Sequence, residues 1–447
     1  MSADGSNDPD ADAPGPDAEG PSADGPADLA AYLRAEVAAT DFRIVVATML
    51  AVYALFAVFT LLAGGGLNTL GSTWVRLTFL FAAYAILSLA LNLHWGYTGL
   101  FNIGVAGFMG VGVYTMAVLS TPPDAISGMG LGLPLPVGIV GGMLAAALVG
   151  LVAAVPALRL RADYLAIVTL GLSEIIRLTL NSATLSGWTI ATFGFGTGGG
   201  SGIDLPARPT DALLDTVVGT ALVDVLDPTI TASVLRRSLW VLVMIGFVIG
   251  IYVLLARVGN SPFGRVLKAI REDELVAQSL GKDTRWFKIK VFMLGCALMG
   301  LGGILWQGSQ GYVSPDSFRP IVTFYVFVAV IIGGSGSNTG SLVGSILFVG
   351  LLFEGPRTFG NIVSNAVSLP SAPGTFAGAV APLASLDVTP LLSYLVGNIS
   401  AFRFILLGVV LILIIQKRPD GVLGHRTETA AAIDLDRPAA NGGGNDE

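Results

Sequence analysis

The chain has 447 residues, of which 53% are hydrophobic and only 12% charged, and its formal net charge is −7. Soluble globular domains carry about 25% charged residues, so this composition excludes an ordinary soluble protein and indicates a chain that lies mostly in an apolar solvent. The single cysteine and the two histidines, His94 and His425, form no ligand cluster. We therefore predict no metal site, no cofactor, no catalytic residues and no nucleic-acid partner.

The two ends of the chain are polar. Residues 1–30 hold eight carboxylates and no Lys or Arg, in a stretch rich in Pro, Gly, Ala and Ser. Such a segment cannot bury enough apolar surface to fold, so we predict disordered tails over 1–40 and 425–447, and a membrane domain over 41–424. The acidic start is unlike the basic start of a secretory signal, so the first apolar segment is expected to act as the insertion signal.

Ten apolar segments between the tails are candidates for membrane spans, which need roughly 20 apolar residues each. The fold class predicted is therefore an all-α polytopic membrane protein with about ten transmembrane helices, some of them broken by glycine. The last two segments before the final one are short, and they form either two full spans or one re-entrant pair. The candidates are residues 44–63, 75–93, 103–119, 134–155, 164–181, 236–256, 288–307, 321–332, 341–354 and 402–416.

The basic residues set the orientation, because Lys and Arg accumulate on the cytoplasmic side. The loop 257–290 alone holds eight of them. Placing it in the cytoplasm puts both termini there too and divides the loop cations into fifteen inside and seven outside. We therefore predict a multi-pass protein of the cytoplasmic membrane. Two external insertions follow, 182–232 and 355–400, and the acidic first one is expected to be solvated and irregular.

A glycine-rich segment, residues 96–112, contains six glycines in seventeen residues. Glycine permits close helix packing in membranes, whereas irregular backbone at membrane depth occurs only where it is buried or lines a cavity. Tight packing and a broken helix beside a translocation path both remain open. The segment 333–340 interrupts the second half similarly, and paired interruptions point to a transport path. The resulting pathway candidates are Gly96, Gly99, Asn102, Gly104, Gly333, Gly334 and Gly336.

The fifth apolar segment carries charges. Asp163 and Tyr164 lie at its start, and Glu174 and Arg177 are three residues apart, on one helix face. Glu174 lies about 16 Å along the helix from Asp163, near mid-membrane, where a charge is by default a functional hypothesis. Asp163, Tyr164 and Glu174 are therefore further pathway candidates. A structural ion pair that locks two helices is the alternative for Glu174.

The loop 257–287 encodes one amphipathic helix over 261–281. Ser261 is a good N-cap, Pro262 suits the first helical position, and Gly281 suits the end. Val266, Ile270, Ala277 and Leu280 are expected on one side. The mixed charges favour docking to a protein rather than resting on lipid, where a uniformly basic face is typical. The residues predicted to make this contact are Ser261, Pro262, Arg265, Lys268, Arg271, Glu272, Asp273, Glu274 and Gly281.

With these segments the chain resembles the permease subunits of branched-chain amino acid ABC transporters, of the LivM type. The resemblance covers roughly 75–182 and 236–424, while the acidic tail and the external insertions are additions. It is carried by GYTGLFNIGVAGFMGVGVYT at 96–115, LRLRADYLAIVTLGLSEIIRLTLNS at 158–182, SPFGRVLKAIREDELVAQSLG at 261–281, VIIGGSGSNTGSLVGSILF at 330–348 and RPDGVLG at 418–424.

The resemblance implies a set of partners. A second permease of the LivH type would complete the membrane core, two cytoplasmic ATP-binding subunits would drive it, and an external substrate-binding protein would deliver the amino acid. The helix 261–281 would be the coupling helix that fits a groove on an ATPase. The chain contains no G-x-x-x-x-G-K-[ST] loop, so hydrolysis is expected on the partner subunits, and this subunit is expected not to be an enzyme.

Three alternatives remain beside an amino acid importer. A sugar or urea permease subunit of the same superfamily is the nearest. A secondary transporter would need an ion site at the midplane and no docking helix in the cytoplasm. An intramembrane enzyme would need a nucleophile and base, for which the sequence offers no plausible pair. The genes beside this one would discriminate the classes, because an importer needs ATPases, a second permease and a binding protein.

Overall fold

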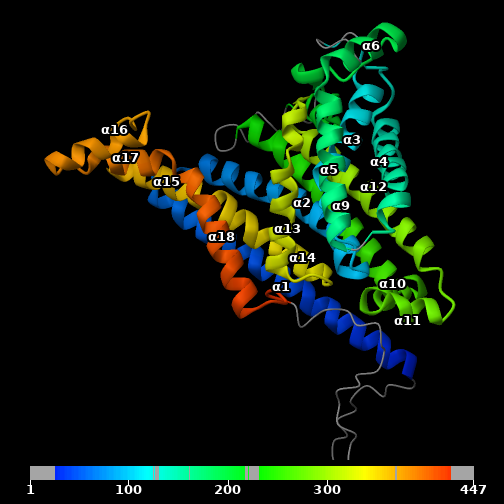
Figure 1. The fold of residues 1–447 in the computed structure, drawn as a ribbon. Helices are drawn as coiled ribbons and strands as arrows, with labels where there is room; N and C mark the ends of the chain where they lie inside the picture. The colour runs from blue at the N-terminus through cyan, green and yellow to red at the C-terminus, as the bar shows by residue number, and fades with distance from the viewer. Residues whose placement is uncertain are drawn as a thin grey trace, which may run out of the picture. The chain divides into compact units, whose positions relative to one another are not determined.

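A computed structural model describes residues 26–423, except 124, 126–129, 161, 217–219, 221–230 and 368–369 (Figure 1). The chain divides into two units, residues 1–46 and residues 47–447. Helix α1 (Pro26–Leu62) begins inside the segment predicted as a disordered tail over 1–40, because Ala, Leu and Glu, all good helix formers, dominate it from there on. The rest of that tail and the second tail, 425–447, lie outside the described residues.

The described part of the second unit is almost entirely helical. Its two short strands, β1 (Ile203–Asp204) and β2 (Tyr312–Val313), pair antiparallel with Ile203 opposite Val313. The longer helices are α2 (Leu67–Thr98), α3 (Val105–Ser120), α4 (Leu135–Ala157), α5 (Ala162–Asn181), α6 (Ala183–Phe193), α9 (Ala232–Asn260), α10 (Pro262–Glu272), α12 (Thr284–Gln307), α13 (Pro320–Gly333), α14 (Asn338–Leu347), α15 (Gly355–Val367) and α18 (Ile399–Lys417). The shorter ones are α7 (Pro209–Leu214), α11 (Glu274–Ser279), α16 (Phe376–Val380), α17 (Thr389–Gly397), the 3-10 turns η1 (Gly199–Ser201), η2 (Pro315–Phe318) and η4 (Ala381–Ser385), and the π-helix η3 (Phe348–Glu354).

The predicted all-α membrane class is confirmed. Within the described residues, seven helices are long and apolar enough to cross a membrane, and an eighth span results if α5 and α6, which meet at a bend of 61°, count as one. The remaining two predicted spans correspond to the shorter α3 and to α18. The segments before and after 333–340 form two separate candidate spans, Pro315–Gly333 and Asn338–Gly360, so the re-entrant alternative is not needed.

The loops between spans meet in two groups. In one group, Arg271 contacts the Gly96 carbonyl, Gly336 contacts Asn92, and the Val422 amide bonds to the Ile332 carbonyl. All three contacts join connections that would lie on one side of ten up-and-down spans.

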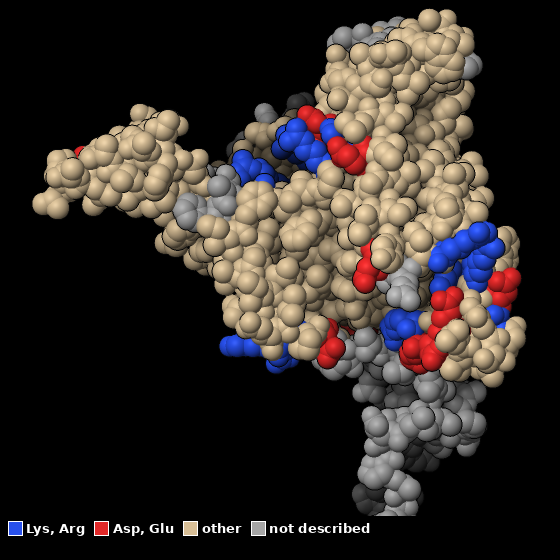
Figure 2. Space-filling model, viewed as in Figure 1, with Lys and Arg blue, Asp and Glu red and all other residues tan. Residues whose placement is uncertain are grey.

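The second group joins the other loops. Thr121 bonds to the Asp204 carbonyl, Thr231 bonds to Asn68, and the Leu205 amide bonds to the Gly311 carbonyl. In Figure 1 the end that carries α10 and α11 lies opposite the end that carries α6. On the visible face, Figure 2 shows charged side chains in a lower and an upper zone, with a largely uncharged surface between them, as a membrane-embedded band requires.

The core is built around α12, which packs against α2, α3 and α4, while α3 and α4 also pack against each other. A Cβ on Gly112 would come within 2.6 Å of the Gly300 backbone, and one on Gly142 within 2.4 Å of the Gly112 carbonyl. Such approach of backbones is the usual way in which membrane helices pack, since lipid provides no hydrophobic drive between them.

The first predicted insertion contains more regular structure than expected. Residues 182–232 contain α6, η1, β1 and α7, rather than irregular backbone alone. Helix α6 continues the apolar pattern of α5, and its Trp188 is exposed. Strand β1 is held by its pairing with β2. The second insertion, 355–400, contains α15, α16 and α17, which lie together in Figure 1.

Candidate functional site

The predicted docking helix is two helices rather than one. Ser261 caps α10 as expected, because its hydroxyl accepts a bond from the Gly264 amide at 3.2 Å, and Pro262 takes the first helical position. The helix then breaks at Asp273, whose carboxylate accepts the amides of Leu275 (2.8 Å) and Val276 (3.1 Å) and so begins α11. Aspartate competes in this way with a continuing helix. Gly281, at a φ of +75°, follows the end of α11.

Two of the predicted docking cations point toward the chain's own membrane domain. The ammonium of Lys268, which is only 4% exposed, lies 5.8 Å from the centre of the Tyr97 ring. Arg271 donates from Nη1 to the Gly96 carbonyl at 2.6 Å. Both contacts are at the C-terminal end of α2, where the unpaired carbonyls of a helix favour positive charge. They attach α10 to α2 at the turn that Gly99 makes with a φ of +70°.

Glu274 fixes α11 to the next helix. Its carboxylate accepts the Thr284 hydroxyl at 2.9 Å and forms an ion pair with Lys288 of α12. Of the other predicted charges, Arg265 and Glu272 are exposed, and Asp273 is used as the cap. Three of the predicted docking residues therefore make contacts within this chain, namely Lys268, Arg271 and Glu274.

The exposed surface of α11 and its flanks carries four large apolar side chains. Leu275 is 73% exposed, Leu280 72% and Val276 55%, and Trp286 on the first turn of α12 is 52% exposed. Ile270 and Ala277 are buried, whereas Leu280, which the sequence pattern placed on the same side, is exposed beyond the break at Asp273. We call Leu275, Val276, Leu280 and Trp286 the α11 surface.

A buried polar network lies beneath α10 and was missed from the sequence. Asn92 of α2 accepts the Gly336 amide at 2.7 Å and donates to Asn338 at 3.2 Å, and Asn338 donates to the Tyr97 hydroxyl at 2.7 Å. Asn92 and Tyr97 are fully buried and Asn338 is 5% exposed. The network connects the end of α2 to the turn between α13 and α14. The only sequence signal was polar residues within otherwise apolar helices.

The glycine-rich segment contains a break in helical geometry. The backbone leaves helical geometry after Thr98 and resumes it at Val105, so the break lies between the candidate spans α2 and α3 and not within one span. Asn102 in the break is fully buried, accepts the Gly104 amide at 2.8 Å and lies 3.1 Å from His94 Nδ1. A Cβ on Gly104 would come within 2.9 Å of the Thr169 carbonyl. The break is thus enclosed by packed helices.

The turn 333–340 is contacted by the residues that directly follow α18. Gly334 and Gly336 have φ values of +105° and +90°, which side chains rarely adopt. The Leu423 amide bonds to the Gly333 carbonyl at 3.1 Å. A Cβ on Gly421 would come within 2.5 Å of the Gly334 amide nitrogen. The RPDGVLG segment therefore caps α13, which accounts for its glycine.

The candidates on α5 lie apart from these residues. Asp163 and Tyr164 are exposed at its start. Glu174 accepts two bonds from Arg177, at 2.6 Å and 2.9 Å, and Arg177 also bonds to Asp316 of η2 at 3.1 Å. Because η2 precedes α13 directly, the pair of Glu174 and Arg177 is linked to the segment that leads into α13.

Comparison with known proteins places this arrangement in a family. The family described as "Branched-chain amino acid transport system / permease component" matches residues 73–415. The chain belongs to this permease family. The matched range contains every pathway and docking candidate named above, from Gly96 to Gly336, and the segments 182–232 and 355–400.

Three LivM proteins are similar to this permease. It is 35% identical over 274 residues to the high-affinity branched-chain amino acid transport system permease protein LivM of Escherichia coli, and 33% identical over 273 residues to that of Salmonella typhimurium. It is 27% identical over 299 residues to the probable branched-chain amino acid transport permease protein LivM of Methanocaldococcus jannaschii.

Each match covers 60% of this permease, and the matches cover 60%, 60% and 77% of the three relatives. The chain therefore spans about three fifths of the length of the first two curated relatives. No solved structure matches this permease.

Proposed function

We propose that this chain is one permease subunit of an ATP-binding-cassette importer that moves branched-chain or related amino acids across the cytoplasmic membrane. The family and the printed names of the LivM relatives support the substrate class. The partners proposed are a second permease of the LivH type, two cytoplasmic ATP-binding subunits and an external substrate-binding protein. Hydrolysis would occur on the ATP-binding subunits.

The observation that carries the proposal is the α11 surface. Four large apolar side chains, more than half exposed, lie on α11, directly after it and on the first turn of α12, and contacts with α2 and α12 hold α10 and α11 in place. Exposed apolar side chains with polar groups around them are typical of a protein contact, and Arg265 and Glu272 of α10 are exposed as well. We assign this surface to the ATP-binding subunit.

The contacts behind the α11 surface suggest how a movement there would reach the spans. Arg271 holds the Gly96 carbonyl, and the adjacent Tyr97 is joined through Asn338 to the turn between α13 and α14. A displacement of α10 would therefore act on both glycine interruptions together. Fully bonded buried networks are stiff, which suits them to this transmission.

Charge placed on the α11 surface tests the proposal. In the complete complex, Leu275→Glu together with Leu280→Glu should reduce copurification of the ATP-binding subunits by about tenfold or more, because buried contacts at an interface centre dominate affinity. Arg271 and Glu274 are less suitable targets, since their internal contacts would be lost as well. Leu160→Glu is the matched control, an exposed leucine in another loop of the same predicted side.

Wild-type ATPase association and uptake by the double variant would show that α11 does not couple the subunits. Substrate class needs a separate measurement, in which proteoliposomes that hold the complex and its binding protein are offered leucine, ribose and urea. Uptake of ribose or urea alone would support the alternative superfamily members. Uptake without ATPases, driven by an ion gradient, would support a secondary transporter.

The orientation proposed, with both termini cytoplasmic, is tested by labelling in intact cells. A cysteine at Ser201, in a chain that carries Cys296→Ser, should react with an impermeant maleimide before lysis, because 182–232 would be external. A cysteine at Ser279 should react only after lysis. The opposite pattern would invert the topology and remove the α11 surface from the cytoplasm.

A further inference from the structure

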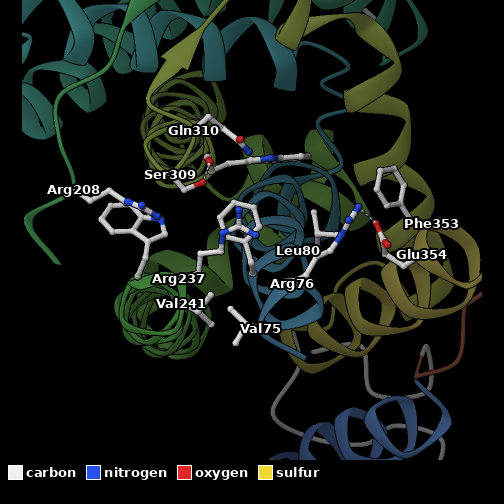
Figure 3. A pocket seen from close by; sticks show the side chains of 13 residues that line it. Val75, Arg76, Leu80, Arg208, Arg237, Val241, Ser309, Gln310, Phe353 and Glu354 are labelled. Carbon is white, nitrogen blue, oxygen red and sulfur yellow. Dashed lines mark hydrogen bonds and ion pairs between the residues drawn. The ribbon is translucent and has the colours of Figure 1, made fainter. Parts of the chain in front are cut away.

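A pocket of about 280 Å³ opens among α2, α9, α12 and the end of η3 (Figure 3). The loops around it belong to the group away from α10 and α11, so the proposed orientation makes it external. Trp240 and Trp306 contribute indole rings to its walls, and Arg76, Arg237, Gln310 and Glu354 contribute polar groups. Its volume is just below that of pockets for drug-sized ligands, about 300–1,000 Å³, which suits a molecule as small as an amino acid.

Glu354 is the unusual member of the pocket. Its side chain is only 7% exposed and forms an ion pair of 2.9 Å with Arg76, whose side chain is 46% exposed. It is the last residue of the π-helix η3, within a span candidate. Buried ionisable residues in spans are costly and by default functional, and π-helical segments occur frequently at functional sites.

The pocket also holds a cation without a counter-ion. Arg208 is paired with Asp211 at 3.0 Å, and Arg76 with Glu354. Arg237 is exposed and, among the described residues, makes no ion pair. In Figure 3, Arg237 lies across the pocket from the Arg76–Glu354 pair in this view. The pocket therefore offers one buried carboxylate, one paired guanidinium and one spare guanidinium.

We infer that this pocket binds the zwitterionic head of an α-amino acid, an inference that rests on the proposed function. Arg237, assisted by Arg76, would take the carboxylate, since guanidinium matches carboxylate geometry. Glu354 would take the ammonium group, and Trp240 and Trp306 would cover an apolar side chain. Nothing in the α11 surface or in the glycine interruptions provides such a set of charges.

The charges favour a zwitterion over other small ligands. A simple carboxylate would satisfy Arg237 but would offer no donor to Glu354, which Arg76 contacts at one oxygen, and an amine would face Arg237. A sugar or urea would leave Arg237 and Glu354 desolvated without charged partners, which costs affinity. A zwitterion satisfies both signs and leaves the net charge of the site unchanged.

Direct binding to the complete complex, purified with its second permease and ATP-binding subunits but without the binding protein, tests the inference. Radiolabelled L-leucine should bind, whereas 4-methylpentanoate, which lacks the ammonium group, and 3-methylbutylamine, which lacks the carboxylate, should each bind at least tenfold more weakly. Arg237→Gln and Glu354→Gln should each weaken leucine binding at least tenfold. Arg319→Gln, an exposed arginine outside the pocket, is the matched control.

Arg237→Gln keeps the test clear if Glu354→Gln assembles poorly, because Arg237 is exposed and has no ion pair to lose. Equal binding of leucine by wild type and Arg237→Gln, in a complex that still copurifies with its ATPases and imports leucine, would overturn the inference and leave the proposed function standing. Equal binding of leucine and the two analogues would overturn it as well. A wild-type complex that neither copurifies with ATPases nor imports leucine would instead contradict the proposed function.

Discussion

Glu174 and Glu354 both lie within apolar helices, and they meet arginine in different ways. Glu174 pairs with Arg177 three residues along the same helix, and its side chain is 36% exposed. Glu354 pairs with Arg76, 278 residues away in the sequence, and its side chain is 7% exposed. One pair follows from helix geometry, whereas the other exists only because α2 and the end of η3 are packed together.

The difference bears on which pair has a function. A pair on one exposed helix face contributes little, about 0.3–0.5 kcal/mol in soluble helices. The pair of Arg76 and Glu354 must offset the desolvation of the buried carboxylate, so it is retained only where geometry is good or function requires it. Glu174, which stands out in the sequence, is therefore less informative about function than Glu354.

The largest effect should come from separating the buried pair. Arg76→Met removes the partner of Glu354 and leaves a buried carboxylate, which should lower the free energy of unfolding by about 2 kcal/mol. Adding Glu354→Gln should restore most of this stability, because a neutral amide needs no counter-ion. Thermal melting of the purified complex measures both variants.

Transport should follow a different order from stability in these variants. The Arg76→Met and Glu354→Gln double variant should melt near wild type yet import leucine poorly, because the pocket has lost its carboxylate. Wild-type uptake by a stable double variant would make the pair purely structural. Such a result would place Glu354 in the same class as Glu174.

Much of the fold could be predicted because apolar length and basic loops are local properties. Each of the ten predicted spans coincides with a helix, although α1 and α2 begin well before the predicted starts at 44 and 75, and 341–354 continues from α14 into η3. The N-cap at Ser261 was also predictable, because a capping bond spans three residues. These features depend on neighbours in sequence.

The remainder depended on contacts between distant segments. The break at Asp273 was missed because the charge pattern over 261–281 fits one helix as well as two. Lys268 and Arg271 were predicted to contact a partner protein, because nothing in the sequence shows that the end of α2 lies against them. The bonds of Asn92 and Asn338 cross 246 residues, and periodicity within a span carries no information about such a pairing.

A middle-sized effect is expected at Arg177. It bonds to Glu174 and to Asp316, so it connects α5 to the segment before α13. Arg177→Gln should lower the free energy of unfolding by about 1 kcal/mol and reduce the yield of assembled complex. Arg319→Gln is the control, because Arg319 pairs with the same Asp316 but is 60% exposed and lies beside it in sequence. Equal yields for the two variants would show that Arg177 does not join the segments.

The smallest effect is expected at Glu174. Glu174→Gln leaves the bond between Arg177 and Asp316 in place, and the amide oxygen can still accept one bond from the guanidinium. The loss should therefore be below about 1 kcal/mol, seen as a modest fall in assembled complex with nearly normal import per complex. Measuring uptake against the amount of complex in the same proteoliposomes separates the two quantities. Normal assembly with abolished import would reverse the assignment, because a group that supports structure alone cannot stop transport in a fully assembled complex. Glu174 would then join Glu354 as a residue of the pathway, and exposure on the isolated chain would mark a surface completed by the second permease.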